Sequence, residues 1–539
     1  MRGTRAGVAV AAAALIVGGA AGAPAAAPKP PTYGSQRLVL RTDVADHGTP
    51  RIEQSADFNN DGYVDVVLAR ANRPTFDTYP LQIFLNDRHG GFYDATRFVF
   101  DGPPPRLQFP RELVVADFNR DGRPDVYVAD HGYDAFPGPG YQNTLALSTP
   151  SGKLRDATAD LPQRFDFTHS ATAADVNGDG TLDLYVGNTY TDALKVPPEI
   201  QLNDGTGRFR SCADCLPELV RSKITVPWHP RPLDGPTYTA SELVDVNGDG
   251  APDLALAGNG YYRVDQDGIV TSDHQILLND GTGHFRVLAG ALPPRPFDNT
   301  GYGMDVRGIE LNRDGRTDLL FTYAKTDPYG LGRWIQLLVN NGDGTFRDET
   351  SARLPQADNT APTFISYLLL VDLNGDGADD VFAQLVNGAK DPPPVYLNDG
   401  RGAFRPLAPG YGKTVDNVFT MVDARRDGSR DLFTTSTYDY PVARSYVVPQ
   451  TGKKIRPGTP AAPSIVRAAS GMLLSWPYEW GAARYEVWRA PSRTGRRARI
   501  ATTRLMRFAD PTGSVGSVYW LRAVNAAGAG AFGEPALAR

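Results

Sequence analysis

Residues 175–183 have the sequence DVNGDGTLD, with oxygen-bearing side chains at the first, third, fifth and ninth places and glycine at the sixth. Negative charges so close together repel one another unless a counter-ion lies between them. Oxygens at alternate positions of a tight loop converge on one point, which suits a calcium ion with about six to eight oxygen ligands. The nonapeptide therefore predicts a calcium loop whose ligands are the side chains of Asp175, Asn177, Asp179 and Asp183 and the backbone carbonyl of Thr181.

The pattern recurs along the chain, and successive copies start 51 to 70 residues apart. Such regular self-similarity indicates a repeat architecture. The complete copies are Asp57–Asp65, Asp117–Asp125, Asp175–Asp183, Asp245–Asp253 and Asp372–Asp380. Two further copies are imperfect, because Glu310–Asp318 begins with glutamate and Asp423–Asp431 has Arg425 at the third place.

The first half of this loop is shared with the EF-hand, which needs a carboxylate at the twelfth place and a helix after it. The twelfth places here are Leu68, Val128, Val186, Leu256, Phe321, Ala383 and Thr434. Each copy is followed by a short apolar run rich in β-branched and aromatic residues, which is typical of a buried strand. The sequence thus predicts a metal-binding turn between two strands, and the alternative is an Asx-rich hairpin turn that binds no metal.

A second turn signature follows most of the loops. It appears as FLNDRHGGF (84–92), QLNDGTGRF (201–209), LLNDGTGHF (277–285), LVNNGDGTF (338–346) and YLNDGRGAF (396–404), and more weakly as LALSTPSGKL (145–154). Asn-Asp-Gly between apolar runs indicates a β-hairpin. Each repeat is therefore expected to hold four antiparallel strands, and seven repeats predict an all-β, seven-bladed β-propeller.

The seventh repeat has no fourth strand of its own, because its third strand runs into a proline-rich segment. The strand-like segment QRLVLRTD (36–43) stands before the first loop without another role. We expect it to complete the last blade and close the ring, which removes exposed sheet edges.

Over residues 36–450 these repeats resemble the FG-GAP/VCBS calcium-binding repeats of integrin alpha-chain propellers and of secreted bacterial proteins. The resemblance implies calcium wherever the pattern stands, with a backbone carbonyl ligand from the seventh place. The further ligands it implies are Asp57, Asn59, Asp61, Tyr63, Asp65, Asp117, Asn119, Asp121, Arg123, Asp125, Asp245, Asn247, Asp249, Ala251, Asp253, Glu310, Asn312, Asp314, Arg316, Asp318, Asp372, Asn374, Asp376, Ala378 and Asp380. We expect about six calcium ions, and the Asp423–Asp431 copy is a doubtful site because Arg425 would repel a cation.

The N-terminus carries a targeting signal. Residues 1–27 hold two arginines, an uncharged apolar run and a small-residue cleavage site, which are typical of a signal peptide. We therefore expect a secreted, periplasmic or cell-surface protein without a membrane span after cleavage. Residues 28–35 are a proline-rich leader, 36–455 the propeller and 456–463 a stiff proline-rich linker.

Residues 464–539 resemble a fibronectin type III β-sandwich. Trp476 matches the early core tryptophan of that fold, and Tyr519 matches its tyrosine corner. We expect both side chains to pack in the core of a small C-terminal domain.

The two cysteines, Cys212 and Cys215, have C-x-x-C spacing. In an exported chain this spacing favours a local disulfide. A zinc site needs about four ligands, and the sequence has no second cysteine pair. A free or reactive thiol pair is the alternative.

Propeller geometry places the loops and the Asn-Asp-Gly turns on one face and the remaining connections on the other. These connections are long and aromatic, at 131–141, 226–238, 258–267 and 327–334. Tyrosine and tryptophan beside polar groups are typical of binding surfaces. We therefore expect a monomeric binding or adhesion module whose aromatic face takes an extracellular protein or polysaccharide, with no nucleic-acid partner.

The alternative is a secreted polysaccharide lyase or hydrolase with its site on that same face. His131, His169 and His229 lie in or beside these connections and could supply acid–base chemistry. No G-x-S-x-G, H-E-x-x-H or P-loop motif is present, so no residue is assigned a catalytic role and binding is favoured over catalysis.

Overall fold

The computed structural model describes residues 31–538, apart from 44–48, 72–76, 134–136, 190, 192, 195, 222–237, 259–261, 265–267, 271–272, 300, 326–329, 356–360, 387–390, 392, 408–418, 440–441, 452–453, 461, 469–470, 477–478, 480 and 534. The predicted signal peptide at 1–27 lies outside the described residues, as do the first three residues of the leader. Within the described part, no helix is long and apolar enough to cross a membrane.

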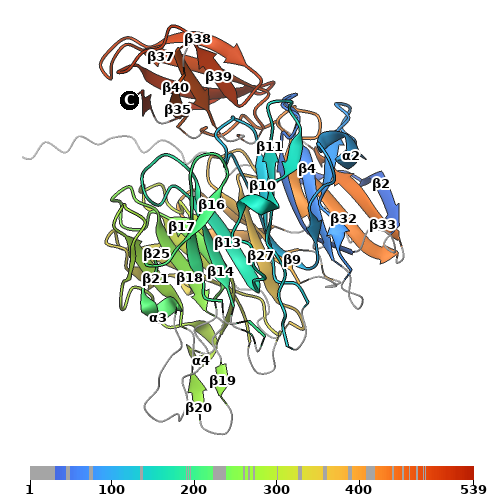
Figure 1. Ribbon diagram of the computed structural model, residues 1–539, viewed down its shortest axis with the longest axis vertical. Helices are drawn as coiled ribbons and strands as arrows, with labels where there is room; N and C mark the ends of the chain where they lie inside the picture. The colour runs from blue at the N-terminus through green and yellow to red at the C-terminus, as the bar shows by residue number, and fades with distance from the viewer. Residues whose placement is uncertain are drawn as a thin grey trace, which may run out of the picture.

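The described chain is nearly all β, with seven four-stranded antiparallel sheets that each hold one nonapeptide between their first two strands (Figure 1). The first four sheets are β3 (Thr49–Ala56), β4 (Asp65–Ala71), β6 (Gln82–Asn86) and β7 (Phe92–Asp94); β9 (Pro110–Ala116), β10 (Asp125–Asp130), β11 (Thr144–Ser148) and β12 (Leu154–Asp156); β13 (Thr168–Ala174), β14 (Asp183–Asn188), β15 (Glu199–Asn203) and β16 (Phe209–Cys212); and β17 (Tyr238–Val244), β18 (Asp253–Gly258), β21 (Gln275–Asn279) and β22 (Phe285–Val287).

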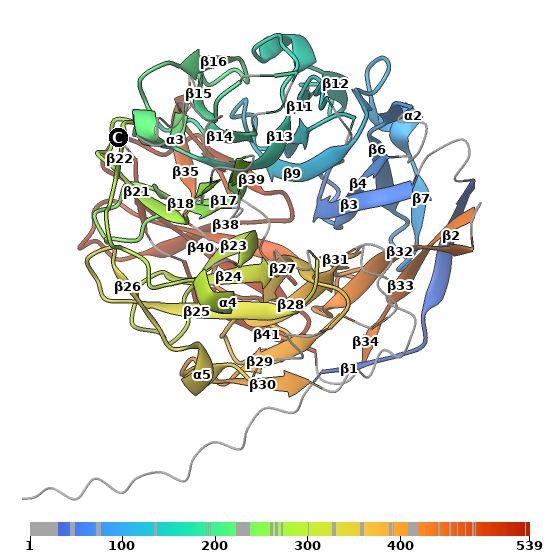
Figure 2. The same ribbon diagram turned by 90° about the horizontal axis from the view of Figure 1, so that it is seen from below.

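The other three sheets are β23 (Tyr302–Ile309), β24 (Asp318–Ala324), β25 (Trp334–Asn340) and β26 (Phe346–Asp348); β27 (Ile365–Val371), β28 (Asp380–Leu385), β29 (Val395–Asn398) and β30 (Phe404–Leu407); and β31 (Phe419–Val422), β32 (Asp431–Asp439), β33 (Val442–Val448) and β2 (Arg37–Asp43). Figure 2 shows the sheets around a ring, with the first strand of each sheet toward the centre. The sheets are therefore the blades of a β-propeller, and we number them in chain order from the blade of β3.

The N-terminal strand closes the ring. β2 pairs antiparallel with β33, from Arg37 opposite Val447 to Asp43 opposite Val442. This confirms the prediction that residues 36–43 complete the last blade. A second pairing, between β1 (Thr32–Tyr33) and β34 (Gln450–Thr451), ties the end of the expected leader to the same blade.

The core lies between neighbouring blades. Every residue of the second strands β4, β10, β14, β18 and β24 is buried. The apolar second place of the nonapeptides joins this core, as at Phe118 and Val176, which are fully buried. Because both faces of these strands are covered, their sequences are apolar runs and not alternating patterns.

The C-terminal unit consists of two packed sheets. One contains β35 (Ser464–Ala468), β36 (Gly471–Ser475) and β39 (Arg507–Asp510); the other contains β38 (Ala498–Thr503), β37 (Arg484–Ala490), β40 (Val518–Asn525) and β41 (Gly528–Phe532), with β42 (Ala536–Leu537) on β40. Trp476, Tyr485 and Tyr519 lie in its core. The Tyr519 hydroxyl donates a hydrogen bond to the Asp510 carboxylate at 2.9 Å. In a tyrosine corner the hydroxyl bonds to a backbone group, so the bond partner of Tyr519 differs from that of the predicted motif.

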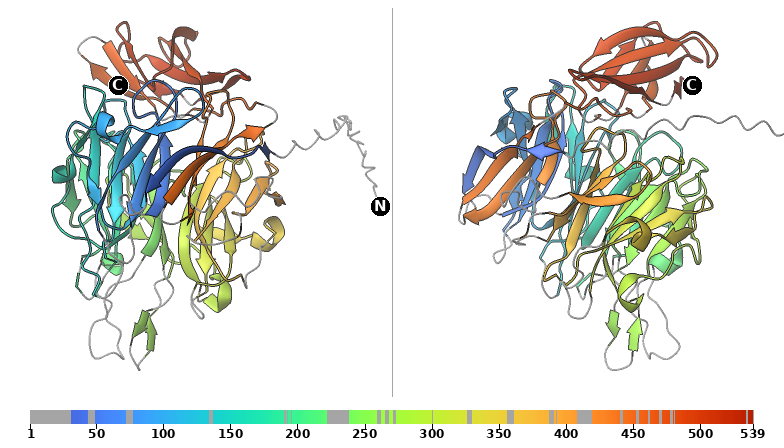
Figure 3. Two further views of the ribbon diagram at one scale, coloured as in Figure 1. Left: turned by 90° about the vertical axis from the view of Figure 1, so that its right-hand side faces the viewer. Right: turned by 180° about the vertical axis from the view of Figure 1, so that it is seen from behind.

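The C-terminal unit lies over the face of the ring that carries the nonapeptide loops (Figures 1 and 3). Arg507 Nη1 donates to the carbonyl of Asp121, the fifth place of the second loop, at 3.1 Å. Asn525 Nδ2 donates to the carbonyl of Ile455 at 2.6 Å and lies close above Gly428 of the seventh loop. This unit therefore covers part of the loop face.

Short elements complete the described chain: α2 (Thr96–Val99), η1 (Thr158–Asp160), α3 (Glu218–Arg221), α4 (Pro296–Asn299), α5 (Thr350–Arg353), the pair β5 (Tyr79–Pro80) and β8 (Arg106–Leu107), and the hairpin β19 (Tyr262–Val264) and β20 (Gly268–Val270). The β19–β20 hairpin projects from the ring on the side away from the C-terminal unit (Figure 3). None of these helices flanks a nonapeptide loop.

Candidate functional site

Each nonapeptide is a hairpin turn between two strands, as the sequence predicted. The first loop, for example, joins β3 to β4, and its sixth-place Gly62 has φ of 84°. Gly180 has the same role in the third loop, with φ of 83°. Positive φ is costly for residues other than glycine, which explains the fixed sixth place.

Backbone N–H groups fix the first-place carboxylate. In the first loop, Asp57 Oδ1 accepts from the N–H of Asp61 at 3.0 Å and Asp57 Oδ2 from the N–H of Gly62 at 2.6 Å. Asn59 Oδ1 and Asp61 Oδ1 accept from N–H groups two residues further on, at 2.9 and 2.8 Å. These Asx turns hold the oxygens of the first, third and fifth places in one tight loop.

The ninth-place aspartate connects the loop to the Asn-Asp-Gly turn. Asp65 Oδ2 accepts from the N–H of Phe58 at 2.9 Å, and Asp65 Oδ1 accepts from the N–H of Asn86 at 2.8 Å. The same two bonds occur at Asp183, from Val176 and Asn203. The loops and the Asn-Asp-Gly turns therefore share one face, as expected.

The loop carboxylates are desolvated and close to other acids. Burial raises the pKa of Asp57 to about 7 and the pKa values of Asp125 and Asp380 to about 8, although backbone N–H groups partly offset the shift. Neighbouring carboxylates in the same loop raise these values further. A divalent cation would stabilise the ionised carboxylates and offset the repulsion between them.

The donor chemistry of the loops fits a hard cation. Asp175 Oδ1 is buried and has no hydrogen-bond partner among the described residues. Among the described residues, however, three acidic, histidine or cysteine side chains have all their ligand atoms within 4.8 Å of one another only at Cys212, Asp214 and Cys215, which lie outside the loops. A cation in a loop would therefore need the amide and backbone carbonyl oxygens as well as the carboxylates.

The asparagine of the Asn-Asp-Gly turn joins neighbouring blades, a role that the sequence analysis missed. Asn279 Nδ2 donates to the carbonyl of Pro252 in its own blade at 3.1 Å and to that of Val176, the second place of the preceding loop, at 2.8 Å. The equivalent links are Asn86 to Ala424, Asn203 to Phe118, Asn340 to Val246, Asn398 to Leu311 and Gln450 to Leu373. The second blade has Ser148 at this place, and its hydroxyl donates to Asp121 instead, at 2.9 Å.

Arginines at the fourth place add a second link between loops. Arg120 donates from Nε to the carbonyl of Gly180 and from Nη2 to that of Asp179, both at 3.0 Å, in the loop of the next blade. Arg313 makes the same contact with the carbonyl of Asp376 at 2.7 Å. The fourth place lies outside the acidic pattern, so the pattern gave no signal of this contact.

The seventh loop contains protein cations where the others have an amide. Arg425 Nε lies 3.9 Å and Lys454 Nζ 3.3 Å from Asp427 Oδ2. Burial would raise the pKa of Asp427, but bonds from Ser429 and Lys454 outweigh it and lower that pKa. The negative charge of this loop is therefore compensated by side chains of the protein.

A second polar cluster lies at the centre of the ring. Arg307 on β23 lies 3.1 Å from Asp305, 3.5 Å from Glu242 on β17 and 3.7 Å from Glu112 on β9. Burial raises the pKa of Glu112 and of Glu242 to about 7, although Arg307 opposes the shift. The cluster unites three blades distant in sequence, which is why no local motif predicted it.

Much of the predicted aromatic face lies outside the described residues, including His229 and the segments 134–136, 222–237, 259–261, 265–267 and 326–329. Two of its described members are not available to a ligand. Tyr238 is buried in β17, and His131 is buried between the rings of Phe109 and Phe167, at 4.8 and 4.6 Å. For Tyr238 and His131 the structure therefore corrects the expectation of an exposed contact, because core packing takes up their rings.

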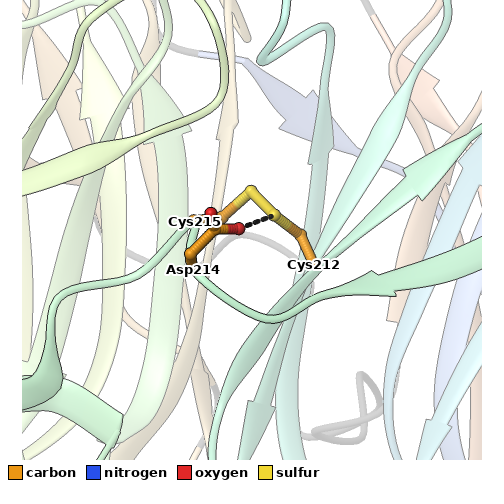
Figure 4. Close-up of side chains that lie close together, drawn as sticks. All are labelled: Cys212, Asp214 and Cys215. Carbon is orange, nitrogen blue, oxygen red and sulfur yellow. Dashed lines mark hydrogen bonds between the residues drawn. A yellow bond between two sulfur atoms is a disulfide. The ribbon is translucent and has the colours of Figure 1, made fainter.

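Cys212 and Cys215 are joined by a disulfide at the end of β16 (Figure 4). Asp214 Oδ1 lies 3.4 Å from the Cys212 sulfur. Because a disulfide offers no thiolate to a metal ion, these residues form a structural cross-link and not a metal site.

Family models for FG-GAP-like repeats match residues 57–128, 245–321 and 311–383, and the FG-GAP repeat model matches 167–208. These matches fall on the blades described above. No curated protein matches the chain.

Solved structures give weak likenesses. Rhamnogalacturonan lyase YesW is 12% identical over 78% of this chain and 75% of its own, with a TM-score of 0.36. Trypanosoma rangeli sialidase is 11% identical over 89% and 83%, with a TM-score of 0.33. The sixth fibronectin type III domain of a human protein is 15% identical over 16% of this chain and 86% of its own, with a TM-score of 0.14. At these TM-scores the likenesses support no conclusion about function.

Proposed function

The chain is a β-propeller built of FG-GAP repeats, and we propose that it is a calcium-binding module of the cell exterior that binds a polysaccharide or a protein. Calcium would occupy six loops, those at 57–65, 117–125, 175–183, 245–253, 310–318 and 372–380. The ion would neutralise carboxylates that the fold brings together and would hold the loop face rigid. The predicted signal peptide supports an exterior location.

The observation that carries this proposal is the charge of the loops. Six loops gather acidic side chains that the described protein compensates mainly with backbone N–H groups, although Arg88 lies 3.0 Å from Asp61 in the first loop. In the third loop, Asp175 keeps a buried oxygen without a hydrogen-bond partner among the described residues. Buried charges in proteins are usually paired or bound to metal ions. In the seventh loop, where Lys454 and Arg425 contact Asp427, the protein itself provides that pairing.

The position of the C-terminal unit favours the opposite face of the ring, and the polar cluster at its centre, for ligand binding. Arg507 and Asn525 attach this unit to the loop side. The cluster offers donors and acceptors together, as at Arg307 and Glu112, which is the chemistry that hydroxyl-rich ligands need. We therefore place polysaccharide ahead of protein as the ligand.

The test is binding to a glycan and protein array by the full mature chain, with calcium and after chelation. We expect specific retention on glycans in calcium and at least tenfold weaker retention in chelator. Retention on no glycan and no protein in calcium would contradict the proposal.

A second function, cleavage of a polysaccharide, is favoured by one observation. Glu112 and Glu242 flank Arg307, and both have a pKa of about 7, close to the value at which a carboxyl can act as acid or base at neutral pH. Soluble fragments released from a bound polysaccharide, and their loss in Glu242→Gln, would establish catalysis. Binding without any release would leave the protein a binding module.

A further inference from the structure

A cavity of about 270 Å³ lies at the inner edge of the ring, where β3, β27 and β31 face the central cluster. Its lining includes Arg51, Glu112, Arg307 and Tyr367, together with Leu368 and Phe419. The volume is just below the range of about 300–1,000 Å³ typical of small-molecule sites. A ligand here would therefore be about the size of one sugar ring.

One wall of the cavity pairs a donor with an acceptor. Glu112 Oε1 lies 3.7 Å from Arg307 Nη2, which is too far for a hydrogen bond. The two side chains nevertheless keep 14% and 26% of their surface exposed, although they lie inside the ring. A guanidinium and a carboxylate held side by side can donate to one hydroxyl and accept from its neighbour.

The wall is held rigidly by contacts across the ring. Arg307 is fixed by Asp305 at 3.1 Å, a carboxylate that also accepts from the N–H of Leu368 at 2.7 Å. The Tyr367 hydroxyl on β27 donates to the carbonyl of Arg111 on β9 at 2.9 Å, which joins blade 6 to blade 2. Groups held in place before binding lose little conformational freedom when the ligand arrives.

The rest of the lining mixes polar and apolar side chains. Gln54, Ser55 and Gln384 add hydrogen-bonding groups, whereas Ile52, Leu368 and Phe419 are apolar. Sugar rings have the matching character, because their C–H groups are apolar and their hydroxyls are hydrogen-bonding groups. A cavity that offers both kinds of side chain fits such a ring.

The surroundings of Arg307 discriminate among sugars. Three carboxylates, on Asp305, Glu242 and Glu112, lie 3.1, 3.5 and 3.7 Å from its guanidinium group. The single positive charge of Arg307 is therefore already compensated within the protein. A sugar that carries its own carboxylate would compete with these groups for Arg307, at a site where charges interact strongly because water reaches it poorly.

We propose that this cavity binds one uncharged sugar ring, with Arg307 donating to one hydroxyl and Glu112 accepting from the adjacent one. This inference rests on the proposed function and specifies its ligand. It excludes uronic and sialic acids as the sugar that enters the cavity.

The probes are the methyl glycosides of glucose, galactose and xylose, compared with those of glucuronic and galacturonic acid, by saturation-transfer NMR and calorimetry on the full mature chain in calcium. We expect at least one uncharged glycoside to bind and its uronic acid counterpart to bind at least tenfold more weakly. Equal or tighter binding of the uronic acid, or binding of no uncharged glycoside, would overturn the inference.

Two variants locate the site. Glu112→Leu removes the acceptor and Ser55→Trp fills the cavity, and each is expected to weaken binding at least tenfold. The control is Glu349→Leu, which loses contacts with Arg347 and Arg353 on the outer edge and should bind as the wild type does. Thermal melting checks that each variant is folded. If Glu112→Leu unfolds the protein, Ser55→Trp alone tests the site, because it leaves the Arg307 cluster intact.

The same variants separate this inference from the proposed function. If the chain binds a glycan on the array and both variants retain that binding, the cavity assignment is wrong while the binding function stands. If the wild type binds nothing on the array, the proposed function itself fails.

Discussion

The seventh loop and the third loop have nearly the same backbone and differ in how closely protein cations approach their carboxylates. Asp423 accepts from the N–H of Gly428 at 2.9 Å, just as Asp175 accepts from the N–H of Gly180 at 2.8 Å. The seventh loop has Arg425 where the third has Asn177, and Lys454 approaches its fifth-place carboxylate. One turn geometry is thus kept with a lysine beside its fifth-place carboxylate and with Arg120 bonded only to its backbone carbonyls.

This difference shows that the fold of the loop does not depend on which groups compensate its charge. The Asx turns and the sixth-place glycine shape the loop. The third place contributes an amide oxygen in six loops and the Arg425 guanidinium in the seventh. The C-terminal unit contacts loops of both kinds, with Asn525 above Gly428 in the seventh and Arg507 bonded to Asp121 in the second.

The largest effect should come from removing calcium altogether. In excess chelator we expect a sharp fall in melting temperature, because each site at 100 times its Kd contributes about 2.7 kcal/mol to stability. Scanning calorimetry with and without calcium measures the shift. An unchanged melt would contradict the assignment of metal to the six loops.

A single-site comparison distinguishes the two kinds of loop. Asp175→Ala should reduce bound calcium by one ion and lower the free energy of unfolding in calcium by about 2.7 kcal/mol. Asp423→Ala, the matched change in the seventh loop, should leave the number of bound ions unchanged. Ion counting by plasma mass spectrometry checks both, and a loss of one ion in Asp423→Ala would remove the distinction.

The links between blades should matter whether or not calcium is present. Asn279→Ala leaves the carbonyls of Val176 and Pro252 and the N–H groups of Gly281 and Gly283 without their partner, at a cost of about 1–3 kcal/mol for each of these groups that stays buried. Ser148→Ala, at the junction that lacks this link, should cost less than about 1 kcal/mol. Urea unfolding measures both, and equal costs would deny the asparagine its role between blades.

The pH dependence of metal-free protein should differ between the places of a loop. Burial raises the pKa of the ninth-place carboxyls Asp183, Asp253 and Asp318 to about 6 from 3.8, so the folded state binds protons more tightly. Their contribution to stability is then present below pH 4 and falls by about 1 kcal/mol for each carboxyl as the pH rises from 5 to 7. The fifth-place carboxyls Asp179 and Asp427 have a lowered pKa, so they contribute stability that is kept over this range and lost only at lower pH.

Urea unfolding of metal-stripped protein at pH 5 and pH 7 tests this sign. Stability that rises between these values would contradict it. Calcium-loaded protein is the control, because bound ions should reverse the trend by competing with protons.

The sequence predicted the parts of the fold that repeat. The acidic nonapeptide marked each first hairpin, the apolar runs after it marked the buried strands, and residues 36–43 marked the closing strand. The contacts it did not predict join distant blades. Asn279 bonding to Val176, Arg120 to Gly180 and Arg307 to Glu112 depend on how the ring closes, and a pattern local to one repeat carries no information about its neighbours.

Counting calcium ions per chain by native mass spectrometry tests the central claim most directly. The account predicts about six ions on the wild type and one more on Arg425→Asn combined with Lys454→Ala, because that variant restores an uncompensated seventh loop. A wild-type chain that binds no calcium, or a variant whose count does not rise, would contradict it.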